Sequence, residues 1–209
     1  MFKRVVLAAL IASLVVPLAA QAPAGWKVRL DRSKSAQDPD DKSGVTFMAM
    51  GKGFHVAGGP AGVYWNPSGT ATGNFIAKGT FTLLKPSNHT NYYGLVFGGQ
   101  GLEGADQRYT YFTVAQDGTF LIKQRTGEAT TDIKGYTPSP AIKKPDATGK
   151  SVNALEVRVS GDTVTYVVNG TVVHTTPKSE LKTPTDGIVG FRVNHVTEVQ
   201  VDGFEVQKS

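Results

Sequence analysis

The stretch from Tyr92 to Arg125 constrains the fold most, because it has the pattern of three consecutive antiparallel strands. Side chains of a strand point alternately to its two faces, and this stretch alternates with that period of two. The middle strand has Thr110, Phe112 and Val114 on one face and Tyr109, Tyr111 and Thr113 on the other. Asp117-Gly118 suits a tight hairpin turn before the third strand, because Gly readily adopts positive φ angles. We therefore expect a sheet with one core face and one face of tyrosines and basic residues.

The C-terminal third repeats the strand pattern. Residues 155–159, 163–168, 172–175, 188–193 and 198–206 form short alternating or β-branched runs, and Asn169-Gly170 is a strong hairpin signal. No segment after residue 20 has a sustained helical period. Many short strands without helices between them predict an all-β fold, a two-sheet antiparallel β-sandwich. The segment 63–67 is expected to be a short aromatic segment, and the region 126–150, which lacks periodicity, a long functional or crossover loop.

The first 20 residues have the composition of a secretory signal peptide. Lys3 and Arg4 precede an apolar run from Val5 to Val16, and small residues follow. A retained membrane anchor is the alternative, but the run is shorter than the roughly 20 residues that span a bilayer. We expect residues 1–20 to be removed, residues 21–209 to form a single domain without a membrane span, and the protein to be secreted or periplasmic.

Composition excludes several classes of protein. The chain has no cysteine, so no disulfide framework supports it. Its 22 Lys and Arg residues exceed its 17 Asp and Glu residues, yet they are scattered along the chain. A nucleic-acid-binding protein would gather them on one stretch or face, so we expect no nucleic-acid partner.

Metal and cofactor sites have weak signals. The loop from Asp31 to Asp41 also holds Asp38 and Asp40, and carboxylates of this kind bind Ca²⁺, but the spacing of a dedicated calcium loop is absent. The four histidines are far apart in the sequence. We expect a solvated loop and no cofactor, with structural calcium in this loop as the alternative.

The strand-rich segments together resemble a known superfamily. They read YYGLVFGG, QRYTYFTVAQDGTFLIKQR, NALEVRVSGDTVTYVVNGTVV, GIVGFRVNH and VQVDGFEV. This order is similar to that of the concanavalin A-like lectin/glucanase superfamily, in particular laminin-G-like modules and 3-keto-disaccharide hydrolase domains, which are distant relatives of family 16 glycoside hydrolases. The resemblance implies a jelly-roll sandwich and a carbohydrate ligand.

The catalytic motifs of these relatives are missing. Family 16 enzymes carry E-x-D-x-E on one strand, which aims the carboxylates into one groove. Here Glu198, Asp202 and Glu205 come nearest, but their spacing sends them to different faces. The sequence therefore favours a carbohydrate-binding module without an evident catalytic motif. A glycoside or 3-keto-disaccharide hydrolase-like enzyme and a structural or protein-interaction module of the cell envelope remain alternatives.

Aromatic and hydrogen-bonding side chains on the non-core face are the candidate ligand-binding residues. Sugars present apolar C–H faces beside dense hydroxyl groups, so their sites combine aromatic platforms with polar groups. The candidates are Trp65, Asn66, Gln107, Tyr109, Tyr111, Lys123, Arg125, Arg192, Asn194 and His195. Cross-strand stabilisation of an exposed sheet face is the alternative role for such residues.

Overall fold

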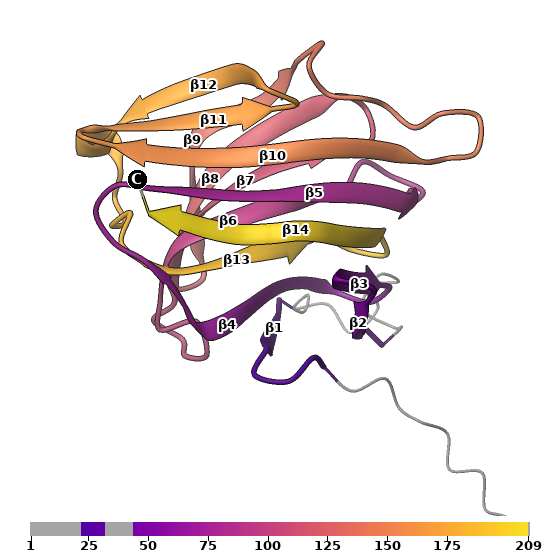
Figure 1. Cartoon of the computed structure of the whole chain (residues 1–209), viewed down its shortest axis with the longest axis horizontal. Helices are drawn as coiled ribbons and strands as arrows, with labels where there is room; N and C mark the ends of the chain where they lie inside the picture. Colours follow the sequence, from indigo (N-terminus) through magenta and orange to yellow (C-terminus); the bar gives the residue numbers. More distant parts are fainter. Residues whose placement is uncertain (1–21, 32–43, 209) are drawn as a thin grey trace, which may run out of the picture.

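Two antiparallel seven-stranded sheets pack face to face in this protein (Figure 1). The computed structural model describes residues 22–31 and 44–208. Sheet A consists, in spatial order, of β1 (Lys27–Asp31), β4 (Ala61–Ala71), β13 (Gly187–Val193), β6 (Tyr92–Gln100), β7 (Arg108–Ala115), β8 (Thr119–Thr126) and β9 (Ala129–Pro138). Sheet B consists of β12 (Thr171–Pro177), β11 (Thr163–Val168), β10 (Ser151–Ser160), β5 (Phe75–Lys85), β14 (Glu198–Lys208), β3 (Gly53–Ala57) and β2 (Thr46–Met50). The predicted all-β, two-sheet antiparallel sandwich is confirmed.

Helical structure is confined to one short 3-10 turn, Lys178–Glu180, among the described residues. No helix there is long and apolar enough to cross a membrane. The predicted signal peptide, residues 1–20, lies outside the described residues, as does the part of the Asp31–Asp41 loop after Asp31.

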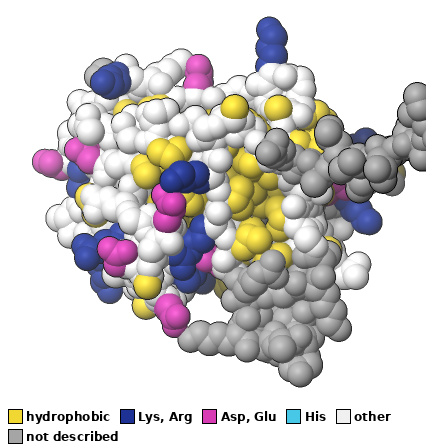
Figure 2. Space-filling view, turned by 90° about the horizontal axis from the view of Figure 1, so that it is seen from below, with side chains coloured by type: hydrophobic (Ala, Val, Ile, Leu, Met, Phe, Trp, Pro, Cys, Tyr) yellow, Lys and Arg dark blue, Asp and Glu magenta, His cyan; other side chains and the backbone are white. Residues whose placement is uncertain are grey.

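The core lies between the sheets, because each strand turns alternate residues toward it. On β5, Phe75, Ala77, Gly79, Phe81 and Leu83 are buried, and the residues between them are partly exposed. Sheet A contributes Phe112 and Phe191, as its period of two predicts. At the side where β1, β2 and β4 lie, hydrophobic side chains are visible from outside as a patch, with basic and acidic side chains interspersed beside it (Figure 2).

The hairpin turns form where the sequence predicts them. Asn169 and Gly170 have φ angles of 49° and 81°, so both central residues of the β11–β12 turn adopt the positive φ of a type I′ hairpin. The Asn169 side chain also fixes the adjoining loop, because its Nδ2 donates to the carbonyl of Ala141 at 2.8 Å. Gly118 (φ 86°) serves the β7–β8 turn in the same way.

One prediction about a connecting segment was wrong, and one short segment belongs to a longer strand. The region 126–150 is not one long loop, because its first half contains β9, which pairs with β8 as the edge of sheet A. The sequence shows no clear hydrophobic alternation here, because most positions of this edge strand are exposed and its pairing with β8 has register shifts. The segment 63–67 is part of the longer strand β4. Pro67 is tolerated there because the pairing with β13 skips from Trp65 to Thr70.

Candidate ligand-binding face

A second apolar cluster covers the outer face of sheet A, the face turned away from sheet B. On β6 and β7, residues such as Tyr93 and Phe112 point into the core, so their neighbours Tyr92 and Tyr111 point outward. The outer cluster consists of Val63, Trp65, Tyr92, Val96, Leu102, Tyr109, Tyr111, Ala115 and Leu121. The sequence predicted this face correctly but not its burial: Tyr109 and Tyr111 are only 0% and 8% exposed.

Three arginines from three strands converge on one carboxylate at this face. Nη1 of Arg192 donates to Oδ2 of Asp31 at 2.5 Å. Nη1 of Arg125 lies 3.6 Å from the same oxygen, and Nε of Arg29 lies 3.6 Å from Oδ1. We call these four residues the arginine cluster. Because Asp31 is the last residue of β1 and the arginines stand on β1, β8 and β13, the cluster joins both halves of sheet A.

The tyrosines of β7 pack against the innermost arginine. Nη1 of Arg192 also donates to the hydroxyl of Tyr109 at 3.2 Å, and its Nε donates to Oδ1 of Asn194 at 2.9 Å. The guanidinium carbon lies 5.3 Å from the centroid of the Tyr111 ring, within the range of a cation–π contact. Arg192 therefore contacts four side chains, those of Asp31, Tyr109, Asn194 and Tyr111.

Burial and charge set the ionisation of the cluster. Burial alone would raise the pKa of Asp31, but the charge and hydrogen bond of Arg192, with the charges of Arg125 and Arg29, hold it below its usual value. Burial raises the pKa of Tyr109. At neutral pH the carboxylate is thus ionised and the phenol is neutral.

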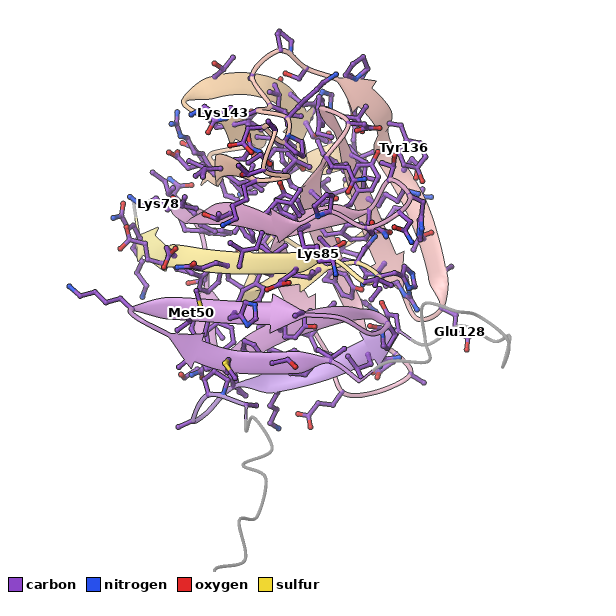
Figure 3. All side chains as sticks on the ribbon, turned by 90° about the vertical axis from the view of Figure 1, so that its right-hand side faces the viewer. Met50, Lys78, Lys85, Glu128, Tyr136 and Lys143 are labelled. Atoms are coloured by element: carbon purple, nitrogen blue, oxygen red, sulfur yellow. The ribbon has the colours of Figure 1, made fainter. Side chains whose placement is uncertain are left out.

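A cavity of about 380 Å³ lies at the other end of the outer face. It is lined by Thr90, Asn91, Tyr92, Asp117, Thr119, Tyr136 and Asn194, and we call it the tyrosine pocket. Tyr136 is 66% exposed, and its ring centroid lies 5.5 Å from that of Tyr92. In Figure 3, Tyr136 stands on the side of the molecule opposite to Lys78 of sheet B. An exposed aromatic ring therefore faces solvent beside several polar side chains.

Hydrogen bonds hold the polar wall of the tyrosine pocket in place. The hydroxyl groups of Tyr92 and Thr119 lie 2.6 Å apart. Oδ1 of Asp117 accepts bonds from the backbone N–H and the hydroxyl of Thr119, at 2.9 and 2.6 Å. Nδ2 of Asn91 donates to the carbonyl of His195 at 2.8 Å. The pocket is built on paired groups and does not depend on a freely rotating side chain.

Lys123 connects the pocket with the arginine cluster. Its Nζ lies 5.4 Å from the centroid of the Tyr136 ring and 3.2 Å from Oδ1 of Asp132. Thr119, Lys123 and Arg125 lie on the same face of β8, since they are an even number of residues apart. At the usual rise per residue, the outer face extends about 20 Å from Thr119 to Arg125.

The structure brings together most of the predicted ligand-binding residues. Tyr109, Tyr111, Lys123, Arg125, Arg192 and Asn194 share this face, and Trp65 is buried in its apolar cluster. Gln107 is fully buried, and its Nε2 donates to the carbonyl of Gly127 at 3.3 Å. Asn66 accepts hydrogen bonds from Ser68. His195 contributes its backbone carbonyl to Asn91. The last three have structural contacts that the sequence did not indicate.

The sequence interpretation missed Tyr136, Asp117, Thr119 and Asn91. Tyr136 lay in the region predicted to be a loop, although the β-branched residues Thr130, Thr131 and Ile133 nearby are a strand signal. The sequence signal at Asp117 is that of a hairpin turn, which does not indicate a ligand-binding role. Sequence spacing also places Asn91 far from Asn194, and only the pairing of β6 with β13 brings them to one pocket.

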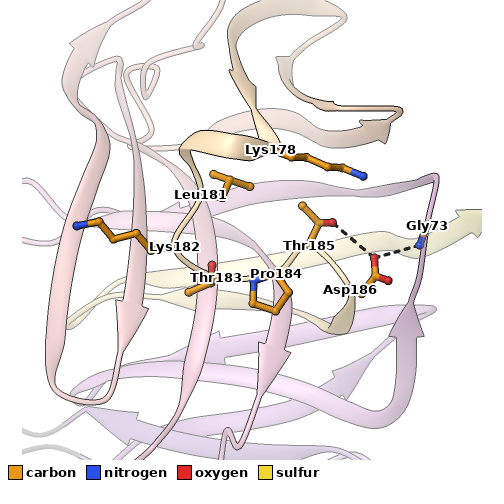
Figure 4. A pocket seen from close by; sticks show the side chains of 8 residues that line it. All are labelled: Gly73, Lys178, Leu181, Lys182, Thr183, Pro184, Thr185 and Asp186. Carbon is orange, nitrogen blue, oxygen red and sulfur yellow. Dashed lines mark hydrogen bonds between the residues drawn. The ribbon is translucent and has the colours of Figure 1, made fainter.

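Another cavity, of about 500 Å³, has a different chemistry. It is lined by Gly73, Lys178, Leu181, Lys182, Thr183, Pro184, Thr185 and Asp186 (Figure 4). Oδ1 of Asp186 accepts a bond from the backbone N–H of Gly73 at 3.0 Å. No aromatic side chain lines it, so it offers no platform for a sugar ring. In residues 22–31 and 44–208, no three His, Asp or Glu side chains lie close enough together to hold a metal ion.

Comparison with known proteins defines the fold. No protein-family model matches the chain. No curated protein is significantly similar to it in sequence. Among solved structures, the carbohydrate-binding module CBM66 from Bacillus subtilis has a TM-score of 0.63 at 12% identity, over 88% of this chain and 96% of that chain. A protein of unknown function with a galectin-like fold from Bacillus subtilis has a TM-score of 0.62 at 14% identity, over 88% and 89%.

An enzyme shares the same architecture. The endo-β-1,3-glucanase from Pyrococcus furiosus has a TM-score of 0.51 at 12% identity, over 70% of this chain and 66% of that chain. At such identities the likeness concerns the fold alone. The chain thus shares its fold with these proteins, and this is the fold that the resemblance to the concanavalin A-like lectin/glucanase superfamily implied.

Proposed function

We propose that this protein is an exported carbohydrate-binding module whose ligand lies along the outer face of sheet A. The observation that carries the proposal is Tyr136, which exposes two thirds of its surface beside the carboxylate of Asp117 and the amides of the tyrosine pocket. A sugar ring stacks its apolar face on an aromatic ring and directs its hydroxyl groups to polar neighbours. The fold that the chain shares with a carbohydrate-binding module and a galectin-like protein supports this reading.

The pocket is suited to binding because its groups are already in place. The bonds of Thr119 to Tyr92 and Asp117 fix their side chains before a ligand arrives. Binding then costs less conformational entropy than it would on a mobile loop. We assign the sugar hydroxyl groups to two partners, the second oxygen of the Asp117 carboxylate and the side-chain amide of Asn194.

Glycoside hydrolysis is the second candidate function, since a glucanase shares the fold. A hydrolase of this kind needs a carboxylic acid whose pKa is raised so that it can protonate the leaving oxygen. Asp31, the buried carboxylate of this face, has its pKa shifted in the opposite direction by Arg192 and its neighbours. Asp117 is held by Thr119 in a turn. The geometry therefore supports binding better than catalysis.

Export rests on the sequence of the first 20 residues. Under this proposal they are cleaved and the mature chain meets its glycan in the periplasm or outside the cell. Mass spectrometry of the protein purified from its native host would show a new N-terminus near Gln21. An intact N-terminus in the cytoplasmic fraction would contradict export and leave the binding site untouched.

The test of binding is a glycan array probed with the mature chain, Tyr136→Ala and Val152→Ala. Val152 is the matched control, because it is also exposed but lies on sheet B. Loss of a central aromatic contact typically costs more than about 1 kcal/mol, so we expect binding to fall about tenfold in Tyr136→Ala and not in Val152→Ala. Equal binding by all three would contradict the site. Absence of any glycan ligand would favour a structural or protein-interaction module of the cell envelope.

A further inference from the structure

We propose that the glycan bound on this face is acidic, with a carboxylate or sulfate group that meets Arg125 and Arg29 of the arginine cluster. This inference rests on the proposed function and adds the chemical class of the ligand. It follows from the charge balance, from the exposure of two of the arginines and from the position of the cluster relative to the tyrosine pocket.

The cluster has a surplus of positive charge. Three guanidinium groups surround the single carboxylate of Asp31, and Arg cannot lose its proton in proteins. The flanking lysines do not change this balance, because Lys27 pairs with Glu103 and Lys123 with Asp132. The stretch 32–43 contains three basic and three acidic residues, so by composition it adds no net charge.

Two atoms of the cluster, Nε of Arg29 and Oδ1 of Asp31, are buried without a hydrogen-bond partner, and they lie 3.6 Å apart as an ion pair. Buried polar atoms are nearly always paired, and an unpaired charged one is costly. Nη1 of Arg29 donates to the carbonyl of Gly104, so an oxyanion would meet the remaining exposed part of this guanidinium group together with that of Arg125 and would offset the surplus charge. Planar guanidinium groups match carboxylate and sulfate oxygens well, which makes arginine the suitable residue for this task.

Exposure decides which arginines face the ligand. The side chains of Arg29 and Arg125 are 25% and 17% exposed, whereas that of Arg192 is 9% exposed. Arg192 is occupied by Asp31, Tyr109 and Asn194 and acts as the support of the cluster. Arg29 and Arg125 therefore present the charge to solvent.

The distance between the two ends of the face suits an oligosaccharide. Along β8, Arg125 lies about 20 Å from Thr119 of the tyrosine pocket, with Lys123 between them. One sugar ring on Tyr136 and an acidic ring at the arginine cluster would thus belong to the same extended chain. Aromatic stacking supplies contact area at one end, and charge supplies selectivity at the other.

Calorimetric titration with two matched pairs of ligands tests the inference. The first pair is an oligogalacturonate and its carboxyl-reduced form; the second is a sulfated cello-oligosaccharide and its unsulfated form. We expect the acidic member of at least one pair to bind the wild-type chain about tenfold or more tightly, with the preference shrinking as salt rises from low to physiological concentration. The pair that shows the preference identifies carboxylate or sulfate as the source of the charge.

Variants locate the effect on the molecule. Arg125→Gln is expected to remove most of the acidic preference, measured as the ratio of the affinities for the acidic and the neutral member of each pair. Arg158→Gln is the control, because Arg158 is a paired arginine on sheet B. Thermal unfolding of each variant shows whether the fold is retained, and the salt dependence of the wild-type chain tests the charge without any substitution.

The outcomes separate this inference from the proposed function. If the glycan array yields ligands but acidic and neutral members of both pairs bind equally, or only neutral glycans bind, the acidic class is wrong and carbohydrate binding stands. If the preference persists in Arg125→Gln and disappears in Arg158→Gln, the site is misplaced. If no glycan binds at all, the proposed function fails, and this inference fails with it.

Discussion

The outer faces of the two sheets differ in a way that the fold does not require. On sheet B, β5 and β10 alternate between buried and exposed residues, and Lys78, Glu156 and Glu205 face solvent. On sheet A, β6 and β7 are buried at nearly every position, although they belong to the same sandwich. An antiparallel sheet needs only one buried face to form a core. The second buried face of sheet A therefore exceeds what the sandwich core requires.

The two faces also differ in the arrangement of their charged residues. Sheet B spreads isolated pairs over its surface, such as Lys78 with Glu205, whose Nζ and Oε1 lie 2.9 Å apart. Sheet A concentrates three arginines and Asp31 among buried tyrosines. Exposed pairs contribute little to stability, whereas buried charges are costly to leave unpaired. Equivalent substitutions on the two faces should thus have unequal effects.

The largest difference is expected from removal of one carboxylate on each face. Asp31→Asn leaves the buried guanidinium group of Arg192 and the partly buried ones of Arg29 and Arg125 without their counter-charge, so we expect the free energy of unfolding to fall by about 3 kcal/mol. Glu156→Gln removes a partner of the half-exposed Arg158 and should change it by less than about 1 kcal/mol. Urea titrations of both variants measure the contrast. Similar losses would show that the arginine cluster is better solvated than its burial indicates.

A smaller contrast is expected from apolar side chains. Leu121 is 4% exposed on the outer face of sheet A, whereas Val152 is 44% exposed on sheet B. Truncation of a buried leucine creates a cavity, so Leu121→Ala should lower the free energy of unfolding by about 2–3 kcal/mol. Val152→Ala should stay within about 0.5 kcal/mol of the wild type. A negligible loss in Leu121→Ala would mean that the outer cluster is not a second core.

The sequence predicted the core face better than the outer face. Period-two alternation determines which residues share a face, so the inward positions of Phe112, Val157 and Phe191 and the hairpin at Asn169 were all predicted correctly. Alternation does not show what covers the opposite face. The burial of Tyr109 and Tyr111 depends on Arg192 from a strand some 80 residues away, and no local pattern encodes that contact.

The candidate site was predicted in part for the same reason. The basic and aromatic residues of β7 and β8 carry a clear local signal, and the structure groups them on one face. Tyr136 sits on an edge strand with shifted register, where exposure weakens the alternation. Asp31 was considered as a member of an acidic loop. Its role as the centre of three arginines follows only from the pairing of β1 with β4, which places β1 in sheet A.

A further contrast is expected in how the stability of the variants depends on pH. The pKa of Asp31 is lower in the folded chain than its ordinary value of 3.8, so near and below that pH the unfolded state binds more protons than the folded state. The stabilisation by the ionised carboxylate is complete above about pH 4–5 and is lost as pH falls through the folded pKa. Glu156→Gln should retain this acid-dependent loss, and Asp31→Asn should show less of it.

The acid effect is expected to be smaller than the effect of Asp31→Asn at neutral pH, because a protonated carboxyl group keeps two oxygen atoms beside the arginines, whereas asparagine replaces one of them with an N–H donor. Asp146 also has a lowered pKa, through bonds from Thr148 and Lys150, so the wild type alone does not isolate Asp31. The difference between the two variants between pH 2 and 5 is the relevant measurement. Parallel pH profiles would assign the acid sensitivity to carboxylates outside the arginine cluster.

The smallest expected contrast compares one lysine–carboxylate pair on each face. Lys123 and Asp132 lie 3.2 Å apart, with the lysine 19% exposed against the Tyr136 ring; Lys78 and Glu205 lie 2.9 Å apart, with the lysine 36% exposed. Double-mutant cycles to alanine should give about 0.5–1 kcal/mol for the first pair and less than about 0.5 kcal/mol for the second.

The cycle for Lys123 has a further use, because the same side chain contacts Tyr136. In a Tyr136→Ala background, the coupling between Lys123 and Asp132 should change, since the cation–π contact that helps to orient the ammonium group is gone. No such dependence has a physical basis for Lys78, which lies on the opposite side of the molecule from Tyr136 (Figure 3). The coupling energies of the two pairs could instead be equal and independent of Tyr136. In that case the difference in electrostatics between the two faces would be limited to the arginine cluster, and the tyrosine pocket would not take part in it.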